Sequence, residues 1–374
     1  MRGFGGVYAN QRVLVTGDTG FKGSWLAWWL HQLDARVAGL ALSPPTEPSL
    51  HCQADLASVV PHRHADIRNP STLSDALDEL HPRVIFHLAA QSLVRVSYGD
   101  PLETMSTNVM GTAHLLDAVR RSNRPCAVVI ITSDKCYQNR EAPDGYRAGD
   151  PLGGSDPYSA SKGCAEIVTA AFRQSFFSSN HLGQHACAVA SARAGNVLGP
   201  GDWAQDRIVP DCARALNRGM PIQVRNPDAL RPWQHVLEPL SGYLWLGAML
   251  LSSNAARYCD AWNFGPRPDS CRPVRELVEG FVRAWGEGEW QSAREPSPPP
   301  ETHALRLNID KTVAELDWRP VWGFDQMIER TALGYRHLSA NSPEPGAVRE
   351  LLSREIAAYT AQAGAAAVAW TKDA

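Results

Sequence analysis

A tyrosine and a lysine lie four residues apart in Tyr158-Ser-Ala-Ser-Lys162, inside a segment with a helical pattern at residues 158–177. On one helix this spacing places both side chains on the same face, about one turn apart. A free phenol has a pKa of about 10, and a neighbouring ammonium group lowers it. We therefore predict that Lys162 favours the phenolate of Tyr158, which could take a proton from a substrate hydroxyl.

A second group of reactive side chains follows a predicted strand at residues 127–132. Ser133, Asp134 and Lys135 come directly after it and supply a hydroxyl, a carboxyl group and an amine. Ligands of parallel α/β sheets bind at the carboxyl ends of the strands, so these groups are candidates for acid–base chemistry. The alternative is an ordinary polar transition from strand to loop.

Three glycines, Gly17, Gly20 and Gly23, follow the strand expected at Arg12–Thr16 and precede a helix expected at residues 24–33. Strand, glycine loop and helix in this order are typical of a dinucleotide site, where the glycines permit a tight turn and the helix N-terminus attracts pyrophosphate. The second strand, however, ends at Leu42-Ser43 without the carboxylate that would bind the ribose of NAD. The choice between NAD and NADP therefore stays open on physical grounds.

Alternating apolar runs and helical patterns fill the first half of the chain. Strands are expected at residues 12–16, 36–42, 83–88, 127–132 and 186–193, with a weaker one at 59–63 that Pro61 interrupts. A helix is also expected at residues 103–122. This order predicts an α/β fold, a Rossmann-type doubly wound parallel sheet with a smaller C-terminal substrate-binding α/β region.

The alternation of strand and helix patterns ends after Arg193, where glycine and proline become frequent. We expect a dinucleotide-binding domain at residues 10–195, with a segment at about 233–265 returning to it. Residues 196–232 and 266–345 form the expected substrate-binding region, with a surface loop at 296–300. Residues 346–374 are expected to form a C-terminal helix and tail that carry no recognisable chemistry.

Composition excludes several classes of partner. The 374 residues are 44% hydrophobic and 20% charged, with a net charge of −3, which gives no attraction to nucleic acid or to an anionic membrane. No apolar run is long enough to span a membrane, no signal peptide precedes the first strand, and the eight cysteines are scattered, so we expect a cytoplasmic protein. The twelve histidines are dispersed without ligand spacing, so no metal is expected.

Five motifs together resemble the sugar-nucleotide 4,6-dehydratases of the extended short-chain dehydrogenase/reductase family, over residues 10–340. They are Gly17-Asp-Thr-Gly-Phe-Lys-Gly-Ser-Trp-Leu26, Thr132-Ser-Asp-Lys-Cys-Tyr137, Asp156-Pro-Tyr-Ser-Ala-Ser-Lys-Gly-Cys-Ala-Glu166, Arg193-Ala-Gly-Asn-Val-Leu-Gly199 and Arg231-Pro-Trp-Gln-His-Val-Leu-Glu-Pro-Leu-Ser-Gly-Tyr243. Such enzymes oxidise C4 of a nucleotide sugar, eliminate water across C5–C6 and return the hydride to C6, so the NAD is recovered. A lysine at position 135, where most relatives carry glutamate, resembles the branch that acts on CDP-glucose and forms CDP-4-keto-6-deoxyglucose.

The resemblance implies a role for each catalytic candidate. Tyr158 would take the proton of the C4 hydroxyl, with Lys162 beside it on the nicotinamide ribose and Ser133 bonded to the C4 oxygen. Asp134 would protonate the departing C6 hydroxyl. Lys135 would take the C5 proton, which requires a neutral amine, or would stabilise the enolate; the sequence leaves these two roles open.

Binding residues are assigned from the loop, the strand ends and the resemblance. For the cofactor, NAD with NADP left open, they are Gly17, Thr19, Gly20, Phe21, Lys22, Gly23, Asp66, Ile67, Leu88, Ala89, Ala90, Tyr158 and Lys162. For the nucleotide sugar they are Gln91, Asn108, Asn196, Arg207, Arg231, His303 and Arg306. Asp18 departs from the family, which commonly has histidine there, and it puts a negative charge beside the pyrophosphate unless the side chain turns away.

Two other interpretations remain. A 4-epimerase, or a 4,6-dehydratase for another nucleotide sugar, would share the glycine loop and the Tyr158/Lys162 pair, although an epimerase has no use for Asp134 and Lys135. The other alternative is a nucleotide-binding protein that has the same fold but no catalytic activity. A homodimer or homotetramer, assembled through the long helices at 103–122 and 158–177, is expected from the family.

Overall fold

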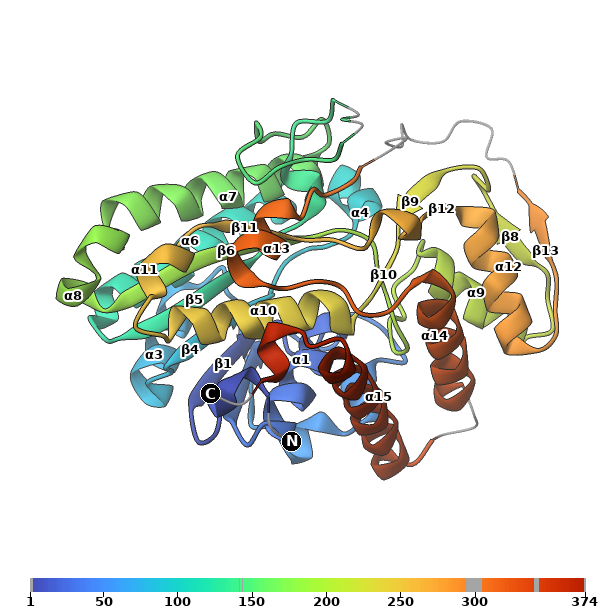
Figure 1. The fold of residues 1–374 in the computed structure, drawn as a ribbon, viewed down its shortest axis with the longest axis horizontal. Coiled ribbons are helices and arrows are strands. Elements are labelled where there is room, and N and C mark those ends of the chain that lie inside the picture. Colours follow the sequence, from blue (N-terminus) through green and yellow to red (C-terminus); the bar gives the residue numbers. More distant parts are fainter. Residues whose placement is uncertain (1–2, 141, 143, 294–304, 340–342, 373–374) are drawn as a thin grey trace.

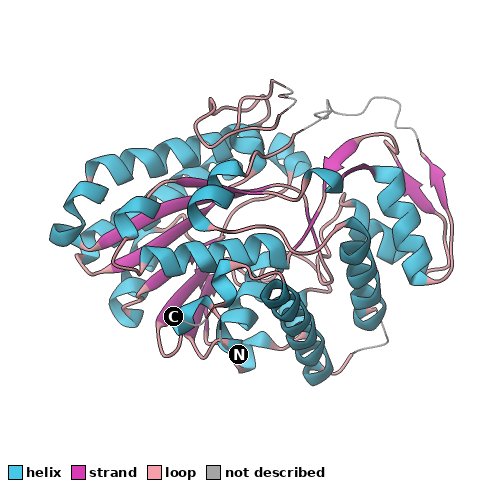
Figure 2. Ribbon diagram, viewed as in Figure 1, coloured by secondary structure: helices cyan, strands magenta, loops and turns pink. Residues whose placement is uncertain are grey.

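The computed structural model describes residues 3–140, 142, 144–293, 305–339 and 343–372 (Figure 1). A large parallel sheet lies on one side of the molecule, and a smaller group of helices and short strands lies beside it (Figure 2). Within the described residues, no helix is long and apolar enough to cross a membrane.

The large sheet has seven strands in the order β3-β2-β1-β4-β5-β6-β11, and every neighbouring pair is parallel. This topology confirms the predicted Rossmann-type fold. The strands are β1 (Arg12–Thr16), β2 (Arg36–Ala41), β3 (His62–His64), β4 (Val84–His87), β5 (Cys126–Ile131), β6 (Cys187–Ala194) and β11 (Ala261–Phe264). β3 begins only after Pro61, because proline has no N–H to give to the ladder, which moves the strand from the expected 59–63.

Successive residues of β1 point to opposite faces of the sheet, as a strand requires. Leu14 packs on the face covered by α3 (Pro70–Leu80), α6 (Gly111–Ser122) and α7 (Pro157–Ser175). Val13 and Val15 pack on the other face, under α1 (Phe21–Gln32) and α10 (Leu237–Leu250). Helices thus cover both faces of the sheet (Figure 1).

The smaller region is built mainly from the chain after β6. Two of its helices, α12 and α14, pack against each other, and the short strands pair as β7–β10, β8–β13 and β9–β12. Its elements are β7 (Val197–Leu198), α9 (Ile208–Asn217), β8 (Ile222–Val224), β9 (Leu230–Pro232), β10 (Gln234–His235), β12 (Cys271–Pro273), α12 (Val274–Trp285), β13 (Trp290–Ser292) and α14 (Phe324–Leu338). The other α-helices in the described residues are α2 (Leu50–Gln53), α4 (Val94–Gly99), α5 (Pro101–Met105), α8 (Leu182–His185), α11 (Ala255–Tyr258), α13 (Asp310–Leu316) and α15 (Pro345–Ala365).

The helix expected at 103–122 is present as one uninterrupted helical stretch from Pro101 to Ser122, but its winding is not uniform. A π-helical turn at Ser106–Met110 separates α5 from α6, which a simple 3.6-residue periodicity could not reveal. Asn108 lies on this turn. Its side-chain amide accepts a hydrogen bond from the backbone N–H of Gln91 and donates one to the backbone carbonyl of Gln91, both at 2.9 Å, and it also donates to Ser161 on α7 at 2.8 Å. The irregular turn therefore ties the end of β4 to α7.

The C-terminal helix α15 is fastened to the core through Glu238 on α10. The Glu238 carboxylate accepts hydrogen bonds from Tyr359 of α15 at 2.6 Å and from the backbone N–H groups of Val321 and Trp322 at 3.0 and 2.7 Å. Near both termini, Phe4 and Trp370 stack with ring centroids 4.8 Å apart. Burial raises the pKa of Glu238 to about 7, although these hydrogen bonds act against the rise.

This raised pKa predicts a defined pH dependence of stability. Between about pH 4.5 and 7 the unfolded chain releases the Glu238 proton while the folded chain keeps it, so stability falls as the pH rises through that window and is constant above it. Relative to the wild type, Glu238→Gln should gain roughly 3 kcal/mol of unfolding free energy between pH 4.5 and 8. Urea unfolding at several pH values measures this, with the exposed Glu329→Gln as control; a difference that does not change with pH would contradict the assignment.

Candidate functional site

The glycine loop between β1 and α1 is shaped by close backbone contacts. Gly17 has φ of +78°, and a Cβ there would meet the backbone N of Ala89 at 2.7 Å. A Cβ on Gly23 would meet the Gly17 carbonyl oxygen at 2.0 Å, so only glycine lets α1 pack onto the loop. At Gly20 a Cβ would find only the Gly17 oxygen, at 3.4 Å. The loop therefore lies against Leu88 and Ala89 at the end of β4 and leaves open space at Gly20, as a pyrophosphate cradle needs.

The Asp18 side chain turns away from this open side. Its Oδ2 lies 2.8 Å from His62 Nδ1 on β3, beneath the loop, and a Cβ on Gly39 of β2 would collide with it. Thr19, the next residue, donates to the carbonyl of Leu42 at 3.0 Å and so holds the loop to the end of β2. The negative charge that the sequence placed beside the pyrophosphate is thus directed to the back of the loop.

The predicted adenine-edge residues follow β3. Asp66 makes a forked pair with Arg68, at 2.6 Å for the shortest contact, and this pairing lowers the pKa of Asp66. Ile67 is buried against Gly111, where a Cβ would meet it at 2.5 Å. Asp66 therefore stays ionised and partly accessible, whereas Ile67 contributes chiefly through packing and its backbone.

Ser133, Asp134 and Lys135 lie at the carboxyl end of β5, on a short 3-10 turn at Asp134–Cys136. Ser133 donates a hydrogen bond to Asp134 at 2.9 Å. Burial raises the pKa of Asp134, while the charge of Lys135 and the bond from Ser133 act against the rise. A Cβ on Gly195 would meet the Asp134 carboxylate at 2.7 Å, so glycine after β6 leaves room for it. A buried carboxyl group with a raised pKa is suited to donate a proton.

Tyr158 and Lys162 lie on the first turns of α7, both buried. We predicted that Lys162 lowers the pKa of Tyr158, and for the protein alone, without cofactor or substrate, this prediction is wrong. Burial raises the pKa of Tyr158 to about 12, and the main opposing influence is a hydrogen bond with Ser133. Burial also lowers the pKa of Lys162 to about 8, against the negative charge of Glu166. Desolvation, which a sequence does not display, therefore outweighs the effect of a neighbouring charge.

Lys22 and Arg207 bring two further positive charges to the same site. The pKa of Lys22 falls to about 8 through burial and through the charges of Arg207 and Lys162, while Asp134 acts in the opposite direction. Arg207 pairs with Asp202 at 2.7 Å, and its charge also acts on Tyr158. The charges of both side chains therefore act on the catalytic groups, which suits a diphosphate or a developing negative charge.

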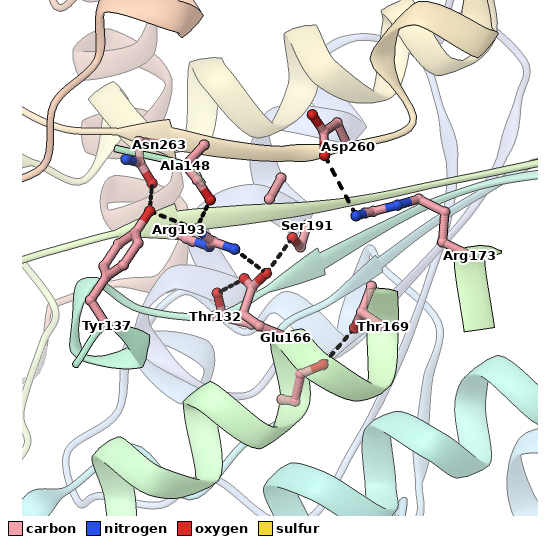
Figure 3. Close-up of polar contacts among 12 residues, drawn as sticks. Thr132, Tyr137, Ala148, Glu166, Thr169, Arg173, Ser191, Arg193, Asp260 and Asn263 are labelled. Atoms are coloured by element: carbon pink, nitrogen blue, oxygen red, sulfur yellow. Dashed lines mark hydrogen bonds and ion pairs between the residues drawn. The ribbon is translucent and has the colours of Figure 1, made fainter. Parts of the chain in front are cut away.

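Two residues that sequence reasoning had not singled out, Glu166 and Arg193, hold α7 in place (Figure 3). They form a buried ion pair at 2.7 Å, with side chains 2% and 4% exposed. Glu166 also accepts hydrogen bonds from Thr132, directly after β5, at 2.5 Å and from Ser191 on β6 at 2.7 Å. Glu166 follows Tyr158 and Lys162 at four-residue steps on one helix face, which is the signal that could have identified it.

Arg193 extends this network to the loop after β5. Its guanidinium donates to the Tyr137 hydroxyl at 2.6 Å and to the Ala148 carbonyl at 2.9 Å, and Tyr137 in turn donates to Asn263 of β11 (Figure 3). One network of hydrogen bonds and an ion pair thus connects α7, β6, β11 and the loop after β5.

The predicted substrate-binding residues separate into two groups. Gln91 and Asn108 are engaged within the protein, since the amide of Gln91 bonds Leu93 and Thr104 and the polar atoms of Asn108 join Gln91 to Ser161. This geometry favours a structural role for both over direct contact with a substrate.

The second group lies in the smaller region. Arg231 on β9 and Arg306 are brought close enough that the charges of both act on Cys271 of β12. Asn196 lies partly exposed between β6 and β7, where its carbonyl accepts from Gln234. His303 lies outside the described residues.

The network predicts strong energetic coupling between Glu166 and Arg193. Replacing one partner leaves a buried charge unpaired, so Glu166→Leu and Arg193→Met should each cost about 3–5 kcal/mol of unfolding free energy. The double variant should cost clearly less than the sum of the two. Chemical denaturation of all four proteins measures the coupling, and the exposed pair Arg272–Glu276 is a matched control expected at about 0.5 kcal/mol or less. Additive effects at Glu166 and Arg193 would refute the coupling.

Known proteins resemble this chain in sequence and in fold. The CDP-glucose 4,6-dehydratase of Salmonella typhimurium is 47% identical over 323 residues, which is 86% of this chain and 90% of the relative. The UDP-glucose 4-epimerase of Mycolicibacterium smegmatis is 33% identical over 88% of this chain and all of its own length.

Two solved structures show the same fold. The UDP-glucose 4-epimerase of Thermus thermophilus in complex with NAD has a TM-score of 0.72 and 26% identity, covering 87% of this chain and 99% of its own. The dTDP-glucose 4,6-dehydratase of Streptomyces venezuelae, with NAD bound, has a TM-score of 0.73 and 24% identity, covering 87% and 97%. Residues 13–255 match the NAD dependent epimerase/dehydratase family, and the chain belongs to that family.

Proposed function

We propose that the chain is an NAD-dependent 4,6-dehydratase that converts CDP-glucose to CDP-4-keto-6-deoxyglucose and water. The observation that carries this proposal is the acid–base group at the end of β5, where buried Asp134 has a raised pKa and lies between Ser133 and Lys135. An epimerase acts at C4 alone and has no use for an acid and a base at C5 and C6. The 47% identity to a CDP-glucose 4,6-dehydratase supports the choice of substrate.

The glycine loop fits a dinucleotide. The Gly17 and Gly23 contacts shape the cradle, and the N-terminus of α1 at Gly20 has no side-chain cap among the described residues. Thr19, Gly20, Phe21 and Lys22 would hold the pyrophosphate, and Lys162 the nicotinamide ribose. NAD would supply the hydride acceptor, and later the hydride donor, of the reaction. The family match favours NAD over NADP.

The chain's own groups account for the proton transfers. Tyr158, with its pKa near 12, accepts the C4 proton only when further positive charge stabilises the phenolate. Ser133, which acts to lower the pKa of Tyr158, would help to hold the phenol at the C4 oxygen. Asp134 gives its proton to the C6 hydroxyl as water leaves, and Lys135 takes the C5 proton that the C4 ketone makes acidic.

The other end of the substrate belongs in the smaller region. The charges of Arg231 and Arg306 both act on Cys271, and a pair of arginines is suited to bind a diphosphate. In the sequence, Asn196 and Arg207 come after Lys162 and before Arg231. Lys135, in place of the more common glutamate, supports the CDP-glucose branch through the family resemblance.

Incubation with CDP-, dTDP-, GDP- and UDP-glucose and trace NAD tests this function. We expect CDP-glucose alone to lose one water and gain a C4 ketone, detected by mass spectrometry and carbonyl NMR. Inversion at constant mass would make the protein an epimerase, and inertness toward all four would favour a binding protein.

The same assay in D₂O tests the individual roles. Lys135→Met should abolish deuterium entry at C5, and Asp134→Asn should keep it while water loss slows about 10²–10⁴-fold. Lys372→Met, at an exposed lysine near the C-terminus, is the matched control for loss of one amine. Undiminished C5 exchange in Lys135→Met would assign Lys135 to stabilisation of the enolate.

We also infer a cytoplasmic homodimer, or a homotetramer built from it. Support comes from the eight unpaired cysteines and from apolar side chains left exposed on α4, α5, the π-turn and α7 and directly after α7. These side chains are Val96, Tyr98, Leu102, Met110, Ile167 and Phe176.

Disruption of this surface should shift the protein toward monomer. Leu102→Glu combined with Ile167→Glu would place charges in an apolar interface, at a high desolvation cost. Sedimentation velocity measures the change, with Leu333→Glu on α14, another exposed leucine, as control. A mass unchanged from the wild type in the double variant would move the interface elsewhere.

A further inference from the structure

Behind the glycine loop, the fold gathers three side chains that are far apart in the sequence. Asp18 comes from the loop, His51 from α2 and His62 from β3, and one potential ligand atom from each lies within 4.8 Å of the other two. Asp18 Oδ2 lies 2.8 Å from His62 Nδ1 and 3.8 Å from His51 Nε2. The sequence predicted no metal-binding cluster because spacing along the chain gave no sign of this convergence.

The Asp18 carboxylate is only half satisfied by the protein. Its side chain is 2% exposed, and within the described residues nothing donates a hydrogen bond to Oδ1. Gly39 makes room for the carboxylate, since a Cβ there would lie 2.0 Å from Oδ2. A buried carboxylate oxygen without a partner is costly, so a site that keeps one calls for a group to neutralise it.

From this geometry we propose that Asp18, His51 and His62 bind a divalent transition-metal ion of the zinc type. Two imidazoles and a carboxylate are a common ligand set for such ions. Ligand atoms of a tetrahedral zinc site lie about 3.3 Å apart, so the Asp18–His62 contact would open by about half an ångström and His51 would move inward. The Asp18 oxygen that now has no partner would face the ion or a water bound to it.

The ion would have a structural role. Its three ligands join the glycine loop to α2 and β3, whereas the acid–base group of the proposed reaction lies on β5 and α7. Because Asp18 lies between Gly17 and Gly20, the ion would restrain the loop that shapes the dinucleotide cradle. The His62 side chain, 16% exposed, gives the ion a route from solvent.

Titration of the full-length, chelator-treated protein with Co²⁺ tests the site without substrate or turnover. Cys52→Ser serves as the background, because Cys52 is the exposed thiol among the eight cysteines. We expect one Co²⁺ to bind per chain and to give the visible d–d absorption of a Co²⁺ ion with a low coordination number. Zn²⁺ should displace the Co²⁺ and should raise the melting temperature of the protein. Absence of stoichiometric Co²⁺ binding would overturn the proposal.

Variants locate the ion. Asp18→Asn, His51→Gln and His62→Gln should each lose stoichiometric binding, whereas His64→Gln, an exposed histidine on the same strand, should keep it. If the ligand variants fail to fold, diethylpyrocarbonate modification of the wild type replaces them: Zn²⁺ should protect His62 and leave His64 reactive. Binding that survives in both Asp18→Asn and His62→Gln, or a His62 that Zn²⁺ does not protect, would place the ion elsewhere. None of these results depends on dehydratase activity.

Discussion

The buried ion pair between Glu166 and Arg193 is the interaction on which the arrangement of the catalytic groups depends. A charge pair this deep in the protein is stable only when hydrogen bonds satisfy its remaining atoms, and Thr132, Ser191 and Tyr137 do so. Thr132 and Tyr137 follow β5, and Ser191 lies on β6. The pair therefore fixes α7, with Tyr158 and Lys162, at a set position relative to Ser133 and Asp134.

Burial then sets the charges within this frame. It raises the pKa of Asp134 and Tyr158 and lowers that of Lys162 and Lys22, so each group is shifted toward its neutral form. An acid that holds its proton and amines that release theirs more easily are what proton transfer near neutral pH requires. The charge of Arg207 already acts against this rise at Tyr158, and the positive charge of a bound cofactor would add to it, which couples the function of Tyr158 as a base to ligand binding.

The glycine loop shows how few residues are needed to build the other half of the site. Gly17 permits contact with the end of β4 and Gly23 permits contact with α1, so the backbone alone forms the cradle. Asp18 could remain in this loop because Gly39 and His62 give its carboxylate a place behind the cradle. Residues of two neighbouring strands thus accommodate the carboxylate of one loop residue.

Local patterns in the sequence determined six of the seven strands of the sheet, the glycine loop and the Tyr158/Lys162 spacing, because each depends on residues close together in the chain. Tertiary structure decided what depends on contacts between distant segments. The Glu166–Arg193 pair, the π-turn at Asn108, the direction of the Tyr158 pKa and the cluster of Asp18, His51 and His62 are all of this kind. Desolvation and convergence in space arise only when the chain folds, so composition and spacing could not reveal them.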